Sequence, residues 1–441
     1  MLRLACPTLP LACPTLRASF RGAKGDESAA RYPLISKCAP DDLALFGGEA
    51  VFDQPLHVGR PNVGDRRRLH ERIDDILDRR WLTNDGPFVR AFEAKVAELT
   101  GVRHCVAVCN GTLALEIAIR ALGLTGEVIV PSFTFVATAH ALEWQGIRPV
   151  FCDVDPATHN LDPRSVEQRI TPRTTGIIGV HLWGRPCDVE GLQALADARG
   201  LTLAFDAAHA LGCSRNGRMV GCFGRAEVFS FHATKFVNAG EGGAVATNDA
   251  DLAARIRSVR NFGFAGYDCV VELGTNGKMS ELAAAMGLTS LESFGPFVEH
   301  NRRNHERYRE TLSDIAGLSL AAYDESERAN YQYVVVEVAA SEAGLSRDQL
   351  VELLWAENIL ARRYFFPGCH RMQPYRTHEP ATVLPVTEAL ASRVLLLPTG
   401  SEVGPDDVAG IGAVLRCAVA HAPEVRRRMA GRPWQYVTDV G

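Results

Sequence analysis

The segment EVFSFHATKFVNAGEGGAVATN, residues 227–248, contains two short apolar runs separated by a glycine-rich turn. The runs at 227–231 and 243–248 have the length and residue types of β-strands. Neither run alternates between apolar and polar residues, so we expect both faces of these strands to be covered. Lys235 follows the first run and lies between apolar residues and the turn, which is an unusual setting for a surface lysine.

The chain before this segment repeats the same kind of pattern. Apolar runs predict strands at 105–109, 127–131, 149–154, 176–182 and 201–208, and helical periodicity predicts helices at 86–99, 112–122, 137–144 and 189–199. Strands that alternate with helices indicate a mostly parallel α/β sheet of about seven strands.

The two ends of the chain differ from this pattern. LACPTLP at 4–10 is nearly repeated as LACPTLR at 11–17, and we expect residues 1–40 to be a disordered extension. A long amphipathic segment at 281–312 leads to a strand at 333–338 and a helix near 347–357. We therefore predict a large ligand-binding domain at 41–290 and a small C-terminal α/β domain at 291–441.

Composition excludes several classes of protein. The 441 residues include 47 basic and 52 acidic side chains, and the net charge of −5 gives no global attraction to nucleic acid or to an anionic membrane. No apolar run approaches the roughly 18 residues of a membrane span. The 12 cysteines are scattered, with no C-x-x-C pair, so we expect reduced thiols, no metal site and a cytoplasmic location.

Ligands of open α/β sheets bind at the carboxyl ends of the strands, so we ask which residues follow each strand. Asn110-Gly111-Thr112 opens directly into a helix, whose free N–H groups and positive dipole end suit a phosphate, although an ordinary helix cap would look the same. Phe135 follows the next strand, where it could cover a planar ligand or pack in the core. Neither G-x-x-x-x-G-K-[ST] nor G-x-G-x-x-G is present, which argues against nucleotide hydrolysis and dinucleotide binding.

Two further strand ends carry ionisable residues. Asp206 ends a strongly apolar run, with His209 three residues later, and a carboxylate in that setting needs a partner. Ser230 and Lys235 stand at the end of the segment quoted first, and a lysine near a strand end is a candidate for a Schiff base. One cofactor uses a lysine, a carboxylate, a donor to a phenolic oxygen, a flat neighbour and a phosphate cradle together, and that cofactor is pyridoxal 5′-phosphate.

These stretches resemble the sugar aminotransferases of the DegT/DnrJ/StrS family. The resemblance runs from about residue 42 to the C-terminal domain. The matching stretches are WLTNDGPFVRAFE (81–93), NGT (110–112), PSFTFVATA (131–139), HLWGRP (181–186), FDAAHALG (205–212), FSFHATKFVNAGEGGAVATND (229–249), GTNGKMSELAAAMGL (274–288) and YFFPGCH (364–370). The resemblance implies the fold type I of pyridoxal-phosphate-dependent transferases, as in aspartate aminotransferase.

The resemblance also implies a role for each site residue. Lys235 would form the Schiff base and shuttle a proton, Asp206 would pair with the ring nitrogen, and His209, where the family usually has glutamine, would contact the phenolic oxygen. The remaining roles are taken by Gly111, Thr112 and Ser230 at the phosphate, Phe135 on the ring face, and Asn276 at the phosphate of a partner subunit in a homodimer.

The loop residues look most like those of enzymes that aminate carbon 4 of dTDP-4-keto-6-deoxy-D-glucose, with L-glutamate as the expected donor and no metal. The product would be dTDP-4-amino-4,6-dideoxy-D-glucose, a precursor of deoxyaminosugars in antibiotics and related natural products. Amination at carbon 3 of a nucleotide keto-sugar, or of a cyclitol, stays open, because regiochemistry depends on how the sugar is oriented. A nucleotide-sugar-binding or regulatory protein without turnover is a second alternative. Lys278 and His370 are candidates for binding the donor carboxylate, although a solvated lysine and a core histidine fit equally well.

Overall fold

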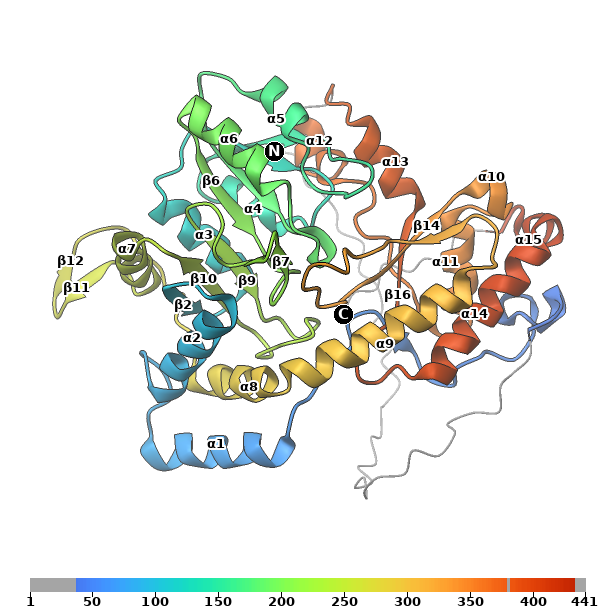
Figure 1. Cartoon of the computed structure of the whole chain (residues 1–441), viewed down its shortest axis with the longest axis horizontal. Coiled ribbons are helices and arrows are strands. Elements are labelled where there is room, and N and C mark those ends of the chain that lie inside the picture. The colour runs from blue at the N-terminus through green and yellow to red at the C-terminus, as the bar shows by residue number, and fades with distance from the viewer. Residues whose placement is uncertain (1–36, 379–380, 433–441) are drawn as a thin grey trace, which may run out of the picture. The chain divides into compact units, whose positions relative to one another are not determined.

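The computed structural model describes residues 37–378 and 381–432, which belong to one compact unit (Figure 1). The extension predicted at 1–40 therefore falls almost entirely outside the described residues. The first described residue, Lys37, is buried, and its amine lies 3.0 Å from a carboxylate oxygen of Glu357. The N-terminal edge of the described chain is thus tied to the C-terminal part.

A seven-stranded sheet forms the centre of the fold, in agreement with the predicted α/β class. Only β10 is antiparallel to its neighbours, and every other adjacent pair is parallel. The order across the sheet is β2 (His104–Val108), β10 (Gly243–Thr247), β9 (Glu227–Ser230), β6 (Thr202–Asp206), β5 (Thr174–Val180), β3 (Glu127–Pro131) and β4 (Arg148–Cys152). The predicted strands all exist, with ends that differ by up to two residues.

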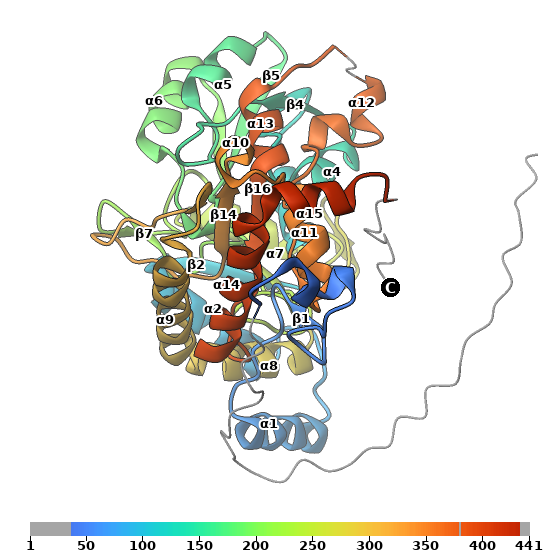
Figure 2. The same ribbon diagram turned by 90° about the vertical axis from the view of Figure 1, so that its right-hand side faces the viewer.

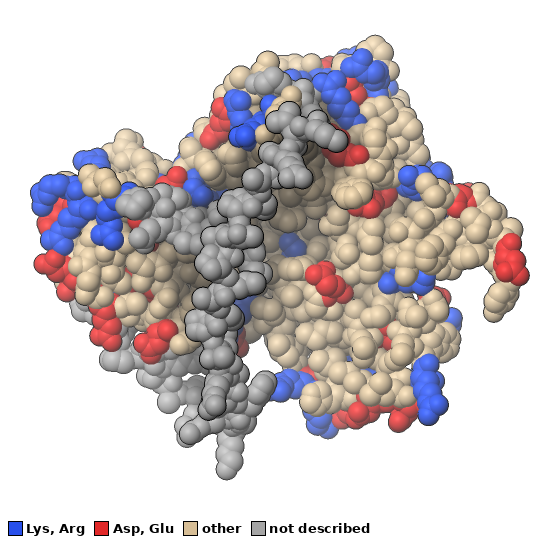
Figure 3. Space-filling view, turned by 180° about the vertical axis from the view of Figure 1, so that it is seen from behind, with Lys and Arg blue, Asp and Glu red and all other residues tan. Residues whose placement is uncertain are grey.

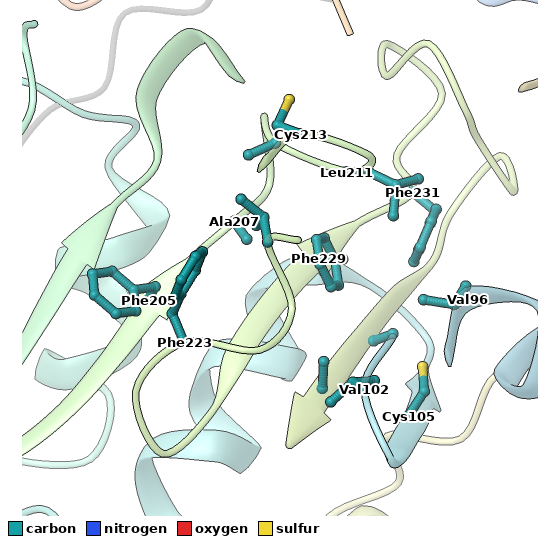
Figure 4. Close-up of a cluster of buried hydrophobic side chains, with 14 of the residues drawn as sticks. Val96, Val102, Cys105, Phe205, Ala207, Leu211, Cys213, Phe223, Phe229 and Phe231 are labelled. Atoms are coloured by element: carbon teal, nitrogen blue, oxygen red, sulfur yellow. The ribbon is translucent and has the colours of Figure 1, made fainter. Parts of the chain in front are cut away.

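Helices cover both faces of this sheet, which explains why its strands read as continuous apolar runs. One buried cluster packs against α2 (Pro87–Thr100), α5 (Pro163–Arg169), α6 (Val189–Arg199) and α8 (Glu281–Glu292). The cluster on the other face packs against α3 (Gly111–Ala121), α4 (Ala137–Glu143) and α7 (Ala250–Arg260). Figure 4 shows part of the first cluster, in which Phe205, Phe229 and Phe231 project from the region of β6 and β9.

The amphipathic segment predicted at 281–312 is two helices, α8 and α9 (Phe294–Leu312), that meet at Ser293. The predicted domain boundary at residue 290 falls in the last turn of α8 and stays a prediction. Helix α1 (Arg66–Arg79) lies apart from the sheet, beyond α8, in both Figure 1 and Figure 2. Its Arg72 reaches α8 and donates to Thr289 Oγ1 at 2.7 Å.

The C-terminal part is built on a three-stranded antiparallel sheet of β13 (Leu318–Leu320), β14 (Val334–Val338) and β16 (Val394–Leu397). Its helices are α10 (Ala340–Ala343), α11 (Arg347–Ala356), α12 (Tyr375–His378), α13 (Pro385–Arg393), α14 (Pro405–Ala420) and α15 (Ala422–Met429). Among the described residues no single helix could cross a membrane, although α14 and α15 pass the length and composition test as a pair bent by 87°. Figure 3 shows basic and acidic side chains side by side on the rear face.

Short elements complete the described chain. The two-stranded pairs are β1 (Leu56–His57) with β15 (Ile359–Leu360), β7 (Ser214–Arg215) with β8 (Arg218–Met219), and β11 (Phe264–Gly266) with β12 (Cys269–Val270). The 3-10 turns are Pro40–Asp42, Ala44–Phe46, Leu182–Gly184 and Cys369–Arg371.

A buried ion-pair network joins α2, β2 and α7 at the edge of the large sheet. The Glu93 carboxylate lies 3.0 Å from Arg260 and 2.7 Å from Arg257, and it accepts the backbone N–H of Ala107 at 2.8 Å. The Glu93 and Arg260 side chains are both less than a tenth exposed. Removing the carboxylate leaves the Arg260 guanidinium buried without its main counter-charge.

We predict that Glu93→Ala lowers the free energy of unfolding by about 3 to 5 kcal/mol, the usual effect of breaking a buried ion pair. Urea unfolding at one fixed protein concentration measures it. The matched control is Glu98→Ala on the same helix, because the Glu98 side chain is 71% exposed and its loss is expected to cost less than about 0.5 kcal/mol. Equal effects of the two substitutions would contradict the structural role of Glu93.

Candidate active site

Residues from separate segments converge at the carboxyl ends of the central strands. Asp206 is the last residue of β6 and Ser230 the last residue of β9, and these strands are parallel neighbours. Gly111 begins α3 directly opposite, since a Cβ on Gly111 would lie 2.9 Å from Ser230 Cβ and 3.0 Å from Ser230 Oγ. The structure thus brings together three of the residues that the sequence selected.

The first turn of α3 forms a cradle with Ser230. Asn110 caps the helix, and its side-chain oxygen accepts the N–H of Leu113 at 2.8 Å. The N–H groups of Gly111 and Thr112 belong to the first turn, where no intrahelical acceptor exists. Thr112 is exposed and Ser230 half-buried, so two hydroxyls and two amides are available to an anion at the positive end of the helix.

The Asp206 carboxylate is buried and hydrogen-bonded on both oxygens. Thr138 Oγ1 donates to Oδ2 at 2.9 Å, and the backbone N–H of Ala208 donates to Oδ1 at 3.0 Å. Burial raises the pKa of Asp206, while these two hydrogen bonds and the charge of Lys235 lower it in part. The carboxylate therefore has a strong preference for a cationic partner in its site.

Lys235 follows β9 by five residues and lies close enough to Asp206 for their charges to interact. Its amine donates a hydrogen bond to the hydroxyl of Tyr333 at 3.2 Å. Burial lowers the pKa of Lys235 to about 8, and the negative charge of Asp206 acts against this shift. An amine with this pKa is partly neutral near physiological pH and can act as a nucleophile or a base.

His209 is buried against the rings of Trp183 and Tyr333, whose centroids lie 5.8 Å and 4.6 Å from its own. Burial, together with the charge of Lys235, lowers the pKa of His209 well below its usual value, so the ring is neutral. The backbone N–H of Trp183 points at Nδ1 at 3.4 Å, and this bond favours the tautomer with the hydrogen on Nε2. A neutral His209 can thus donate one hydrogen bond.

Two residues named from the sequence are exposed. Phe135, in the loop between β3 and α4, leaves 56% of its surface uncovered, as a ring that stacks on a ligand would. Asn276 is also exposed, and its neighbour Gly277 accepts the N–H of Cys109 at 2.8 Å, which places this segment beside the end of β2. Their proposed contacts to a ring and to a partner subunit stay predictions.

The two candidates for a donor carboxylate have partners within the chain. His370 Nδ1 lies 2.7 Å from Ser132 Oγ and its Nε2 lies 3.0 Å from Glu388, so this histidine is the bonded core residue that the sequence left as an alternative. Lys278 donates to Asn261 at 3.1 Å. In the part of the chain that the structure describes, no cluster of three His, Cys, Asp or Glu side chains could hold a metal ion.

Sequence reasoning missed Thr138, Trp183 and Tyr333. Thr138 lies in the quoted PSFTFVATA stretch, and its place in the first turn of a helix after a strand end was an available signal. Trp183 lies in HLWGRP, and its backbone has φ of 61°, which nothing in the stretch indicates. Tyr333 lies 98 residues after Lys235, at the start of a strand in another sheet, so only the folded chain reveals their contact.

A family model places the chain among the aminotransferases. The model of the DegT/DnrJ/EryC1/StrS aminotransferase family matches residues 65–416. The chain belongs to this family, which the fold and the site residues had already indicated.

Two relatives and one solved structure are similar to this chain over most of its length. A dTDP-4-amino-4,6-dideoxy-D-glucose transaminase of Shigella dysenteriae is 37% identical over 365 residues, which cover 83% of this chain and 99% of the relative. A UDP-N-acetyl-3-dehydro-alpha-D-glucosamine 3-aminotransferase of Acidithiobacillus ferrooxidans is 40% identical over 332 residues, or 74% and 87% of the two chains. The crystal structure of DesI in the presence of its TDP-sugar product is 56% identical, with a TM-score of 0.86 and coverage of 88% and 99%.

We predict that the Lys235 amine titrates with a midpoint near pH 8 in the protein without bound carbonyl compounds. Acylation by a small reagent, followed by mass spectrometry of the Lys235 peptide, measures this midpoint because only the neutral amine reacts. Asp206→Asn should move the midpoint to lower pH, because the carboxylate stabilises the ammonium form. The peptide with the exposed Lys95 serves as a reference for the reagent, and an upward shift in Asp206→Asn would refute the assigned electrostatics.

Proposed function

We propose that the protein is a pyridoxal-phosphate-dependent aminotransferase that converts dTDP-4-keto-6-deoxy-D-glucose to dTDP-4-amino-4,6-dideoxy-D-glucose with L-glutamate as donor. The observation that carries the proposal is that the Lys235 amine, bonded to Tyr333, interacts electrostatically with the buried carboxylate of Asp206 beyond the ends of two neighbouring strands. The similarity to the Shigella transaminase and to DesI supports the sugar.

The described residues fit the cofactor. Gly111 lets the first turn of α3 lie against Ser230, because any side chain there would collide with it, and so its amides and the Ser230 hydroxyl can bind one phosphate group together. Asp206 has the buried, hydrogen-bonded carboxylate that a protonated ring nitrogen requires, and His209 has one hydrogen to donate to the phenolic oxygen. The exposed Phe135 is free to cover the ring. When bound, pyridoxal phosphate supplies an electron sink for the carbanion formed at the substrate.

The chain itself binds, orients and moves protons. Lys235 Nζ, neutral in part at pH 7 to 8, can take a proton from the carbon that bears the amino group and give it to the carbon on the other side of that nitrogen. The hydrogen bonds that Thr138 and Ala208 donate favour the ionised form of Asp206 against the effect of burial, and a carboxylate there would hold a proton on the ring nitrogen of a bound cofactor. The buried rings of Trp183 and Tyr333 pack against His209 in the same region.

Carbon 4 is favoured over carbon 3 by the relatives rather than by the geometry. The 3-aminotransferase of Acidithiobacillus ferrooxidans is 40% identical to this chain, so amination at carbon 3 is the alternative. The Shigella transaminase, whose name places the amino group at carbon 4, is matched over 99% of its length, and for this reason we assign carbon 4. A binding protein without turnover would have no use for a lysine amine held at a pKa of about 8.

We further propose a homodimer with shared active sites. Large apolar side chains are exposed on the β11–β12 hairpin and its flanks, which project from the side of the sheet in Figure 1: Phe262, Phe264, Tyr267, Val270, Val271 and Leu273. Such a gathering of apolar surface is typical of an interface. Asn276 adjoins it and is exposed, so a two-fold axis nearby would present Asn276 to the other subunit's cradle.

Incubation with dTDP-4-keto-6-deoxy-D-glucose and L-glutamate should give an amine at carbon 4, identified by carbon-resolved NMR of the product. Lys235→Ala and Lys235→Arg should give no product, because arginine cannot lose its proton to act as nucleophile or base. Amination at carbon 3 would replace the proposed regiochemistry. Near-wild-type turnover by either variant would overturn the role of Lys235.

Mixing two inactive variants tests the shared site. In a mixed dimer of Lys235→Ala and Asn276→Asp chains, one site carries both defects and the other carries neither. We expect mixing to restore activity, up to half the wild-type value per mixed dimer. The introduced aspartate would repel the phosphate only in the partner's site, and that site already lacks its lysine. No recovery after confirmed subunit exchange, or a monomer at working concentration, would show that Asn276 does not serve a partner.

A further inference from the structure

Tyr333 enters the active site from the C-terminal sheet. It directly precedes β14, is only 6% exposed, and its hydroxyl lies 3.2 Å from Lys235 Nζ. Its ring also faces the amine, with Nζ 5.9 Å from the ring centroid. No role for this residue follows from the sequence motifs, yet it contacts the reacting amine.

The position of the Tyr333 ring is fixed on several sides. The ring of Trp183 packs edge-on against it at 5.4 Å, and the ring of His209 lies at 4.6 Å. The hydroxyl of Tyr323 lies 2.9 Å from the carbonyl oxygen of Trp183 and 3.1 Å from that of Tyr333, and it shares its one hydrogen between the two. The phenol oxygen is therefore held in place before any ligand arrives.

The chemistry of a phenol suits this contact. Burial raises the pKa of Tyr333 far above its usual value, so its hydroxyl stays neutral at any working pH. A carboxylate in the same place would stabilise the ammonium form of Lys235 and remove its lone pair from use. A neutral oxygen that accepts an N–H orients the amine and leaves the nitrogen lone pair free.

We propose that Tyr333 is a catalytic residue that holds the Lys235 amine in the orientation needed to form its bond to the cofactor and to carry the proton. The proposal rests on the function proposed above. It assigns to the C-terminal sheet a direct contact with the reacting nitrogen, because Tyr333 directly precedes β14.

Tyr333→Phe tests the proposal, because it keeps the ring and removes only the hydroxyl. Two ligands separate binding from bond formation in the cofactor-free chain. Pyridoxine 5′-phosphate has no aldehyde, so its Kd measures only non-covalent binding at the phosphate cradle. Pyridoxal 5′-phosphate also bonds to Lys235, which changes the visible absorbance. We expect an unchanged Kd for pyridoxine 5′-phosphate and bond formation that is slower by about tenfold at every pH, the usual weight of one orienting hydrogen bond.

The matched control is Tyr308→Phe. Tyr308 is fully buried in α9 and donates its hydroxyl to the carbonyl of Pro398 at 2.8 Å, away from Lys235. This variant should form the bond to pyridoxal 5′-phosphate at the wild-type rate.

In transamination, Tyr333→Phe should lower kcat about tenfold with KM little changed. Tyr333→Ala should lower kcat further, because the ring packing is lost as well.

Each outcome decides the proposal. Wild-type rates of bond formation in Tyr333→Phe, with a visible band still present, would overturn the role of Tyr333 and leave the proposed function standing. A weaker Kd for pyridoxine 5′-phosphate in Tyr333→Phe would also overturn it, because the residue would then act on the shape of the cradle. A wild-type chain that forms no band with pyridoxal 5′-phosphate would overturn the proposed function and this inference together.

Discussion

The burial of the Lys235 amine near the Asp206 carboxylate is the constraint on which the rest of the site depends. Removing water from the amine lowers its pKa from 10.5 to about 8, and this is what makes it reactive. The same burial costs stability. An unfolded chain binds a proton on this lysine up to about pH 10, whereas the folded chain releases it near pH 8, so the stability contribution of this group rises with pH between those values and is least favourable below pH 8.

The topology of the sheet makes that arrangement possible. Parallel strands place their carboxyl ends at one edge, so Asp206 and Ser230 arrive together from β6 and β9 without any special loop. The antiparallel β10 lies between β9 and β2, and its Gly243 pairs with Ser230. A Cβ on Gly243 would lie 2.4 Å from the carbonyl oxygen of Asn110, so the absence of a side chain there lets the start of α3 approach the cradle. Gly243, the last glycine of the turn before β10, thus allows the close packing of the site as well as beginning the strand.

The sequence predicted the strands of the large sheet, because continuous apolar runs are a local pattern. It also selected Asp206, Ser230 and Gly111 at or next to strand ends, and the fold brings these three residues close together. Contacts between distant segments were beyond this reasoning. The hydrogen bond of Tyr333 to Lys235 joins two sheets, and the break at Ser293 divides a segment whose periodicity looked continuous. His370 shows that a motif position alone can mislead. Its place in a motif suggested a contact with the donor carboxylate, whereas in the fold its ring nitrogens lie next to Ser132 and Glu388.

The position of Lys235 also limits where selectivity for the sugar can arise. The Lys235 amine is bound to the hydroxyl of Tyr333, and the ring of Tyr333 packs in turn against Trp183 and His209, so the position from which the amine can reach a carbon atom is restricted. Whether carbon 3 or carbon 4 of a keto-sugar occupies that place depends on how the nucleotide end is anchored, at some distance from the amine. Relatives named for 3-amination and for 4-amination resemble this chain to a similar degree, at 40% and 37% identity. We therefore expect the surfaces that hold the nucleotide, rather than Lys235, Asp206 and Tyr333, to set which carbon of the sugar is presented to the amine.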